Sequence, residues 1–581
     1  MRGHLQQVSS KLVATLLVAV ATAVYLLTLD RSVSWWDCGE FIATGLLLEV
    51  GHPPGAPLYQ LLSHLFMLLS MGHSQWVAPL SNAFSALCGG LTVGLLFLTA
   101  VELGATRRGA VVGALCYLFS DTAWFSAVES EVYSLAVCLA ALEVWLMLCW
   151  RRTRSHRLLP LVSLLVGLGV CVHLLTLLVL PALLLIFISC QRPLGWRLAR
   201  QWCRRLPLMA FFLTLGLTPY LIIPIRAAAH PPINEGDPST PSAFASYLRR
   251  DQYVHAPLYP RMWRERDSLN HREWSGGLEG VAGNAVYYAT YQAGYMYGRY
   301  LMYNFIGREN LKHRRVVLFV VPFLLGLWGL WLQHRRRRTD WWTVLLLFLF
   351  GGLLLNLYLN HPCYEPRERD YAYVLSFYAF ALWIGIGAGE ALRRPRLSGR
   401  RWHGIVATLL VLAAPASLAA GNWSDHDRHR CHSVHDIALN HLQSCDPGAL
   451  LITLGDNDTF PLWYLQQVEH RRQDVEVCNI NLNGFASTLS LASRSLGRRP
   501  VYLSQYCYDR YAALFPGSLR CEGYCWRLLP VGTAADTSDL ALRRHLRDSV
   551  RWHIVPGEYL DPVSLSFLRL WEQNTGVQVG R

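Results

Sequence analysis

The sequence has few charged residues for its length and almost no lysine. Of its 581 residues 16% are charged, whereas about a quarter is usual in soluble proteins. Lys11 and Lys312 are the only lysines, so arginine supplies nearly all of the positive charge. Apolar runs of about 18 to 20 residues recur up to about residue 420. The sequence therefore excludes an ordinary soluble protein and predicts an α-helical polytopic membrane protein.

The positive charge follows the membrane pattern and not the pattern of a nucleic-acid-binding protein. The formal net charge is +14, but the arginines gather in short clusters beside apolar runs, which is typical of cytoplasmic loops. We therefore expect no nucleic-acid partner. The clusters lie at 151–154, 204–205, 335–338, 393–396 and 400–401.

These clusters fix a predicted topology of about eleven spans, with the N-terminus inside and the C-terminus outside. The first apolar run, Leu12–Leu29, lacks a small-x-small cleavage site and is interpreted as a retained anchor. The remaining spans are expected at 80–102, 109–118, 132–150, 158–190 (two short spans with a turn near His173), 206–225, 316–332, 342–359, 371–391 and 405–420. External loops are then expected at 30–79, 120–131, 227–313 and 360–371.

The first external loop contains the most informative stretch. Asp37 and Glu40 are three residues apart, so a helix that starts here would place both on one face. Two short surface helices, 41–50 and 58–69, are expected around a Pro-rich turn. A carboxylate pair at a membrane boundary is typical of a general base that faces the outer solvent. In the alternative interpretation, the carboxylates only end the span and the adjacent tryptophans anchor it.

From Asn422 onwards the composition becomes polar. We divide the chain into a transmembrane domain, 1–421, and an external soluble α/β domain, 422–581. Helices are expected at 432–443 and 460–470, and strands at 449–454 and 475–482. In the turn Gly455–Thr459, two aspartates resemble a divalent-ion loop without its later ligands, so turn capping is favoured and no metal site is predicted. An even number of cysteines allows disulfides of unknown pairing: Cys431, Cys445, Cys478, Cys507, Cys521 and Cys525.

Four segments together carry a family resemblance. They are Trp-Asp-Cys-Gly-Glu-Phe at 36–41, His-Pro-Pro-Gly-Ala-Pro-Leu-Tyr at 52–59, and the segments 131–135 and 367–371. They resemble the membrane O-mannosyltransferase family whose animal member modifies plexin-type IPT domains. Segment 455–464 is similar to the bacterial, Bacteroidetes-type branch, formerly labelled a domain of unknown function. The resemblance implies a GT-C glycosyltransferase with a polyprenyl-phosphate sugar donor, no required cofactor, and a catalytic aspartate in the first external loop, where Asp37 lies.

The remaining candidate site residues follow from this chemistry. A leaving phosphate calls for arginine, whose planar fork binds phosphate oxygens; the candidates are Arg367, Arg369 and Arg226, unless they only pair with nearby carboxylates. Glu40 would tune the pKa of Asp37, or it would only stabilise the start of a helix. The candidates for acceptor or sugar binding are His52, Tyr59, Glu129, Glu131 and His361, with turn-stabilising or capping roles as the alternatives.

The sequence therefore predicts an enzyme that moves a sugar, mannose by family analogy, from a polyprenyl phosphate to Ser or Thr of exported proteins. The expected partners are the bilayer, the lipid-linked donor and the exported acceptor. The expected setting is a bacterial inner membrane with a periplasmic site, or the endoplasmic reticulum lumen in a eukaryote. Two alternatives remain. One is a GT-C enzyme with a lipid or glycan acceptor. The other is a lipid or glycan transporter or flippase, which usually shows repeated halves and charges at mid-membrane.

Overall fold

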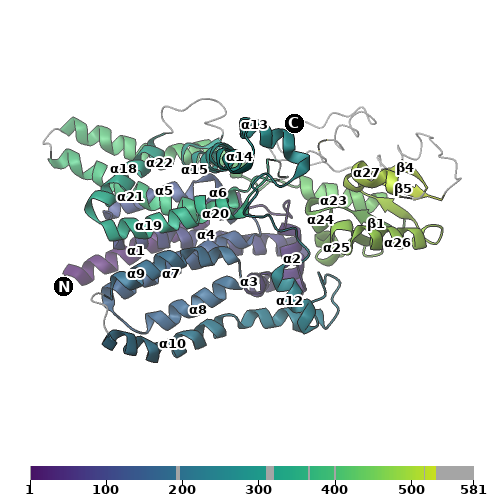
Figure 1. The fold of residues 1–581 in the computed structure, drawn as a ribbon, viewed down its shortest axis with the longest axis horizontal. Coiled ribbons are helices and arrows are strands. Elements are labelled where there is room, and N and C mark those ends of the chain that lie inside the picture. The colour runs from purple at the N-terminus through teal and green to yellow at the C-terminus, as the bar shows by residue number, and fades with distance from the viewer. Residues whose placement is uncertain are drawn as a thin grey trace.

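The computed structural model of the chain describes residues 2–191, 196–308, 320–363, 365, 367–397, 401–515, 517–530 and 565. Long helices run side by side in one bundle, and a small sheet with its own helices lies beyond one end of that bundle (Figure 1). Short helices, among them α2 and α12, lie at the end of the bundle that faces the sheet (Figure 1).

The bundle helices lie where the apolar runs predict them. Each of the roughly eleven expected spans overlaps a helix, including the two short helices on either side of a break near His173. The helices are α1 (Arg2–Thr28), α4 (Val77–Glu102), α5 (Arg107–Leu118), α7 (Val132–Thr153), α8 (Leu158–Val170), α9 (Leu180–Ser189), α10 (Trp196–Gly216), α18 (Val321–Arg336), α19 (Arg338–Phe350), α21 (Val374–Leu397) and α22 (Arg401–His426).

Only some of the bundle helices have the length and composition of a membrane span. Within the described residues, six helices are long and apolar enough to cross a membrane, and up to eight if each of two bent pairs counts as one span. The bends are 65° between α5 and α6 (Asp121–Ala127) and 40° between the end of α10 and the segment that leads into α11 (Ile222–Ala227). The total of about eleven therefore stays a prediction.

Glycines allow α5 and α21 to pack with their backbones in contact. A Cβ at Gly109 would lie 2.3 Å from the Gly385 carbonyl oxygen, and one at Gly113 would lie 2.7 Å from the Ala381 carbonyl oxygen. Small residues at such a crossing bring two membrane helices close together, where van der Waals contact replaces the missing hydrophobic drive. This crossing lies in the main core, which also buries Trp124, Trp150 and Trp383 completely.

The first and third predicted external loops differ in how well the sequence describes them. The first contains α2 (Cys38–Leu47) and α3 (Pro57–Met67), as expected. The third is largely helical: α12 (Pro241–Arg249) and α13 (Ser268–Trp274) precede a continuous helical stretch. That stretch comprises α14 (Gly280–Tyr287), a π-helix (Tyr288–Gly298) and α15 (Arg299–Ile306). Its tyrosines pack by stacking, with ring centroids 5.4 and 5.8 Å apart along 287, 291 and 295, so a helix forms without an apolar run.

The C-terminal region is the small α/β unit that the sequence predicts. Its sheet has the order β2-β1-β3-β5-β4, with β1 parallel to β2 and β3, and β5 antiparallel to β3 and β4. The strands are β1 (Leu450–Thr453), β2 (Glu476–Asn479), β3 (Val501–Leu503), β4 (Ser518–Glu522) and β5 (Cys525–Leu529). The helices are α23 (Ser433–Ser444), α24 (Asp456–Gln467), α25 (Ile480–Asn483), α26 (Phe485–Ser495) and α27 (Gln505–Tyr511).

The domain boundary and possible disulfides were also predicted for this region. Helix α22 continues to His426, beyond the expected domain boundary at residue 421, and the boundary itself stays a prediction. The six cysteines of the region are all described, and the structure joins none of them by a disulfide. Cys445 and Cys525 both donate to the carbonyl of His441, at 3.5 and 3.6 Å.

Candidate functional site

The C-terminal region holds the start of α2 directly. The Trp36 N–H donates to Oδ1 of Asn457, in the first turn of α24, at 2.6 Å. Gly39 packs against the same helix so closely that a Cβ would lie 2.5 Å from the Phe460 carbonyl oxygen. Both contacts join segments more than 400 positions apart in the chain. The backbone on either side of Asp37 is therefore fixed by α24.

Glu40 and His52 form a buried pair across the first loop. Glu40 is 1% exposed; one of its carboxylate oxygens accepts the His52 N–H at 2.5 Å, and the other lies 2.6 Å from Nδ1. A Cβ at Gly51 would lie 2.2 Å from that carboxylate, so only glycine fits there. Burial lowers the pKa of His52, but the charge and hydrogen bond of Glu40 outweigh it and raise this pKa well above its usual range.

Asp37 lies at the open side of this pair. It precedes α2 in the N-cap position, but its side chain makes no capping hydrogen bond, and it is half-buried. One donor atom each from Asp37, Glu40 and His52 lie within 4.8 Å of one another. The predicted catalytic carboxylates therefore come together with one of the predicted histidines.

Two further carboxylates reach this group from other parts of the chain. Glu235 is held beside the loop because its N–H donates to the Val50 carbonyl at 3.1 Å. Burial raises the pKa of Glu235 well above its usual range, and Glu40, Asp456 and Asp37 raise it further while His52 lowers it. Asp456 is the first residue of α24 and has an exposed edge. We call Asp37, Glu40, His52, Glu235 and Asp456 the acidic cluster.

A second charged group lies next to the first, and each of its two carboxylates meets an arginine. Arg367 contacts Glu131 at 3.1 Å and Glu129 at 3.8 Å, and Arg428 donates to Glu129 at 2.7 Å. Burial raises the pKa of Glu131 to about 8, although Arg367 lowers it. We call Glu129, Glu131, Arg367 and Arg428 the paired cluster.

Arg367 also lies near two aromatic rings. Its guanidinium is 5.2 Å from the centroid of the Trp36 ring and 4.4 Å from that of Tyr371. These cation–π contacts add to its two carboxylate partners.

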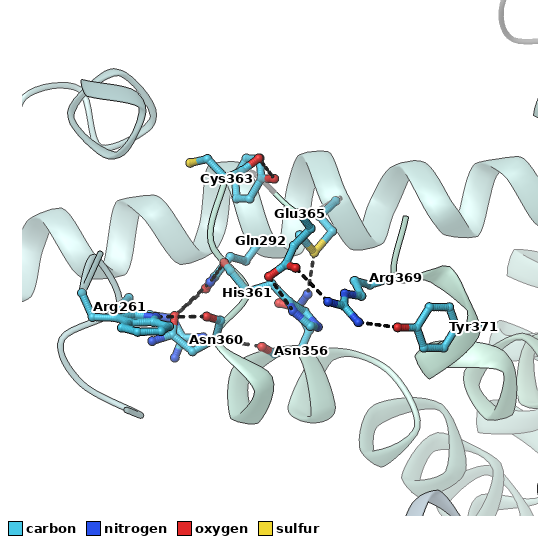
Figure 2. A network of polar contacts seen from close by, with 12 residues as sticks. Arg261, Gln292, Asn356, Asn360, His361, Cys363, Glu365, Arg369 and Tyr371 are labelled. Atoms are coloured by element: carbon cyan, nitrogen blue, oxygen red, sulfur yellow. Dashed lines mark hydrogen bonds and ion pairs between the residues drawn. The ribbon is translucent and has the colours of Figure 1, made fainter. Parts of the chain in front are cut away.

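Arg369 belongs to a third polar network, which Figure 2 shows. It donates to Glu365 at 2.8 Å and to the Tyr371 hydroxyl at 2.5 Å. Its side chain is 32% exposed, and its Nε–H has no acceptor among the described residues. His361 lies 3.8 Å from the same Glu365, and the contacts continue through Gln292 to Arg261 (Figure 2).

The charge of Arg369 also reaches the acidic cluster. Loss of hydration and the charge of Asp37 raise the pKa of Asp456 to about 7, whereas the charges of His52 and Arg369 lower it. Of the predicted phosphate-binding arginines, Arg369 therefore combines exposure with an electrostatic effect on Asp456 of the acidic cluster.

Two predicted site residues have structural contacts instead. Arg226 donates to the carbonyls of Leu48 and Leu47 at 2.6 and 3.0 Å, and so caps the C-terminus of α2. Tyr59 is fully buried against the rings of Phe41 and Phe84, and its hydroxyl lies 3.3 Å from Ser85. Phosphate binding by Arg226 and acceptor binding by Tyr59 remain predictions.

Comparison with known proteins shows which family two parts of this chain resemble. Residues 37–194 match the Protein O-mannosyl-transferase TMEM260 N-terminal domain, and residues 434–486 match TMEM260-associated domain 2. The chain is 22% identical over 507 residues to the protein O-mannosyl-transferase tmem260 of Dictyostelium discoideum, covering 80% of this chain and 57% of that protein. It is 30% identical over 246 residues to TMEM260 of Mus musculus, covering 40% of this chain and 33% of that protein.

Solved structures show the fold. ArnT from Cupriavidus metallidurans, bound to undecaprenyl phosphate, superposes with a TM-score of 0.51 at 13% identity, over 90% of this chain and 99% of that one. AglB, an archaeal oligosaccharyltransferase from Archaeoglobus fulgidus in complex with an inhibitory peptide and a dolichol-phosphate, gives a TM-score of 0.50 at 12% identity, over 85% and 70%. The chain is therefore a helical integral membrane protein with a GT-C fold and a small C-terminal α/β region.

The two matched TMEM260 regions meet in the acidic cluster. The N-terminal region contains Asp37, Glu40 and His52, and the second region contains Asp456. Sequence reasoning assigned the turn at 455–459 to capping, and Asp458 does cap it, because its carboxylate accepts the Leu454 N–H at 2.8 Å. Asp456, two residues before Asp458, belongs to the acidic cluster.

Three other contributors were also missed: Glu235, Asn457 and Arg428. The aspartates of the 455–459 turn and the Pro-rich segment 231–238 were the only signals in the sequence, and neither shows which loop its polar residues would meet.

Proposed function

We propose that this protein is a glycosyltransferase that moves a sugar, mannose, from a polyprenyl phosphate to a serine or threonine hydroxyl of an exported protein. The chain spans 57% and 33% of the two curated relatives above, and their name supports the reaction class. The observation that carries the proposal is Asp37. It is a half-buried carboxylate, held by α24 at the accessible edge of the acidic cluster, and its side chain makes no cap hydrogen bond.

Asp37 serves as the general base. Its carboxylate takes the proton from the acceptor hydroxyl, and the hydroxyl oxygen forms a bond to the anomeric carbon of the sugar. The bond from that carbon to the phosphate oxygen breaks, and the electron pair leaves with the polyprenyl phosphate. The neighbouring Glu40 is saturated by the two contacts from His52, so its part is to position the first loop and not to accept the proton.

Arg369 is the group that meets the departing phosphate. It is partly exposed, and its charge lowers the pKa of Asp456 in the acidic cluster. A planar guanidinium binds phosphate oxygens in pairs. Arg367 instead positions Glu129 and Glu131, because these carboxylates and two rings already surround it.

The site lies on the outer side of the membrane in this proposal. Helix α7 starts next to Glu131 of the paired cluster and ends with Arg151 and Arg152. Its 22 residues span about 33 Å, which is the thickness of a bilayer core. Because arginines mark the cytoplasmic ends of spans, the site and the C-terminal region face the periplasm of a bacterium or the lumen of the endoplasmic reticulum.

The direct test is a transfer assay. Purified protein in detergent is incubated with polyprenyl-phosphate mannose and a panel of exported proteins, and intact mass records the products. A gain of one hexose per modified site, dependent on the protein and on the lipid donor, is expected. If only lipids or free glycans gain the sugar, the protein acceptor is wrong. If no acceptor gains sugar while the donor is bound, the reaction class is wrong.

A further inference from the structure

The acidic cluster has the geometry of a metal site. The donor atoms of Asp37, Glu40 and His52 lie within 4.8 Å of one another, and metal–ligand bonds of 2.0–2.2 Å place opposite ligands about 4.0–4.4 Å apart. Small side-chain movements therefore suffice to surround an ion. All three residues come from one loop that Gly51 and α24 hold in place.

Glu235 provides an independent observation. It is 5% exposed, and neither of its carboxylate oxygens has a hydrogen-bond partner among the described residues. A buried carboxylate without partners is costly, because it loses its hydration and gains nothing in return. Its backbone is paired with Val50, two residues before His52, and the charges that act on it are those of the acidic cluster.

Other buried carboxylates of the same region show what a satisfied group looks like. Asp30 is 4% exposed, and its two oxygens accept the Ser32 N–H at 2.9 Å and the Ser34 hydroxyl at 2.8 Å. Glu129 and Glu131 each accept a hydrogen bond from an arginine through one oxygen, whereas Glu235 has no such counterion in the described part of the chain. Among the described residues, no arginine forms an ion pair with any member of the acidic cluster. Four carboxylates there face one imidazole.

We propose that the acidic cluster binds one divalent cation, which replaces the proton shared by Glu40 and His52, with Asp37, Glu40 and His52 as its core ligands and Glu235 and Asp456 completing the shell. Carboxylate oxygens with a single imidazole nitrogen are a donor set for Mn²⁺; carboxylates alone also suit Mg²⁺ or Ca²⁺, and thiolates favour softer ions. The exposed edge of Asp456 and the partial exposure of Asp37 and His52 leave a path for the ion to enter.

The cation adds to the role of Arg369 at the donor phosphate, and this role rests on the proposed function. A cluster of carboxylates repels a phosphate, and Arg367 is already engaged by carboxylate partners. A bound divalent cation reverses the local charge, so that a phosphate oxygen of the lipid donor can bind beside Asp37.

The test measures Mn²⁺ binding without any sugar donor or acceptor. Protein purified in detergent is stripped with EDTA, exchanged into metal-free buffer and titrated with Mn²⁺, and free Mn²⁺ is read by electron paramagnetic resonance. We expect one bound Mn²⁺ per chain, and at least about tenfold weaker binding in Glu235→Gln and in Asp456→Asn. The control is Glu469→Gln, which removes a carboxylate just after α24 that pairs with His435. This variant should bind Mn²⁺ as the wild type does.

Thermal unfolding provides the second measurement. Mn²⁺ should raise the Tm of the wild type and of Glu469→Gln, and should raise that of Asp456→Asn less, because a ligand stabilises the state that binds it. Asp456 is exposed, so Asp456→Asn should fold. It therefore tests the metal site even if Glu235→Gln does not fold. No stoichiometric Mn²⁺ in folded wild type, or wild-type affinity in both cluster variants, would overturn the site. Neither result touches the transfer reaction, whose failure in Mn²⁺-bound protein would overturn the proposed function alone.

Discussion

The acidic cluster and the paired cluster are neighbours that both contain buried carboxylates, yet they are built in opposite ways. In the paired cluster, Glu129 and Glu131 are each met by an arginine, and Arg367 also lies near two aromatic rings. In the acidic cluster, Glu235 has no partner among the described residues and Asp37 is half-buried. Buried charges that have a counterion specify a structure, whereas accessible charges without one are available for chemistry. We therefore assign a scaffold role to the paired cluster and propose the acidic cluster as the reacting site.

The largest effect on stability should come from the scaffold. Arg367→Met keeps the length of the side chain but leaves Glu131 buried without its counterion. Breaking one partner of a buried ion pair costs about 3–5 kcal/mol, so unfolding in denaturant should begin at clearly lower concentration. Arg494→Met, on the exposed face of α26, is the control and should change stability by less than about 0.5 kcal/mol. Equal stability of the two variants would remove the distinction between the clusters.

The contact between α2 and α24 gives the next effect. In Gly39→Ala the new Cβ would lie 2.5 Å from the Phe460 carbonyl oxygen, so the two helices must separate. Such overpacking costs about 1–3 kcal/mol, and transfer should fall because Asp37 moves with α2. Ser487→Ala, exposed on α26, serves as the control. Wild-type stability and transfer in Gly39→Ala would show that α24 does not hold the first loop.

A smaller and more specific effect is expected at Arg369. Arg369→Lys keeps the charge but loses the planar fork, so the KM for the lipid donor should rise about tenfold, equivalent to about 1.4 kcal/mol. The KM for the acceptor should stay the same. Steady-state kinetics with each substrate varied in turn separates the two. An unchanged donor KM would take Arg369 out of the phosphate site.

The smallest effect concerns the pH dependence of the C-terminal region. Burial lowers the pKa of His435, but hydrogen bonds and charges of Asp436 and Glu469 raise it to about 9. A raised histidine pKa stabilises the fold fully below about pH 6.5 and is lost as the pH rises through about 9. The Tm should therefore fall between pH 6.5 and 9.5, by the equivalent of about 1 kcal/mol, and His435→Gln should flatten that dependence. If the Tm of His435→Gln falls with pH as steeply as that of the wild type, the His435–Glu469 pair is not the cause of the pH dependence.

Much of the fold was predictable because its signals are local. Apolar runs predict the bundle helices, the Pro-rich turn predicts the break between α2 and α3, and buried β-type runs predict β1 and β2. The stretch from Gly280 to Ile306 was missed because tyrosine stacking holds it and not an apolar stripe. A hydropathy pattern does not reveal a helix whose packing residues are tyrosines, because their hydroxyl groups lower the hydropathy.

Only the part of the site that comes from the first external loop was predictable. Asp37, Glu40 and His52 lie within one loop, so their spacing in the sequence is enough to predict that they lie close together. Glu235 and Asp456 reach the cluster through a backbone pairing with Val50 and through the packing of α24 on α2. These are contacts between distant segments, and no periodicity or spacing in a single sequence specifies them.

The most direct measurement compares Asp37→Asn with Glu131→Gln, one carboxylate from each cluster, in the same transfer assay and the same unfolding experiment. The account predicts that Asp37→Asn folds as the wild type does and loses transfer by at least about 100-fold, because the general base is gone. It predicts that Glu131→Gln loses stability and keeps most of its transfer rate per folded molecule. Wild-type transfer in folded Asp37→Asn, with transfer abolished in folded Glu131→Gln, would contradict it and place the base in the paired cluster.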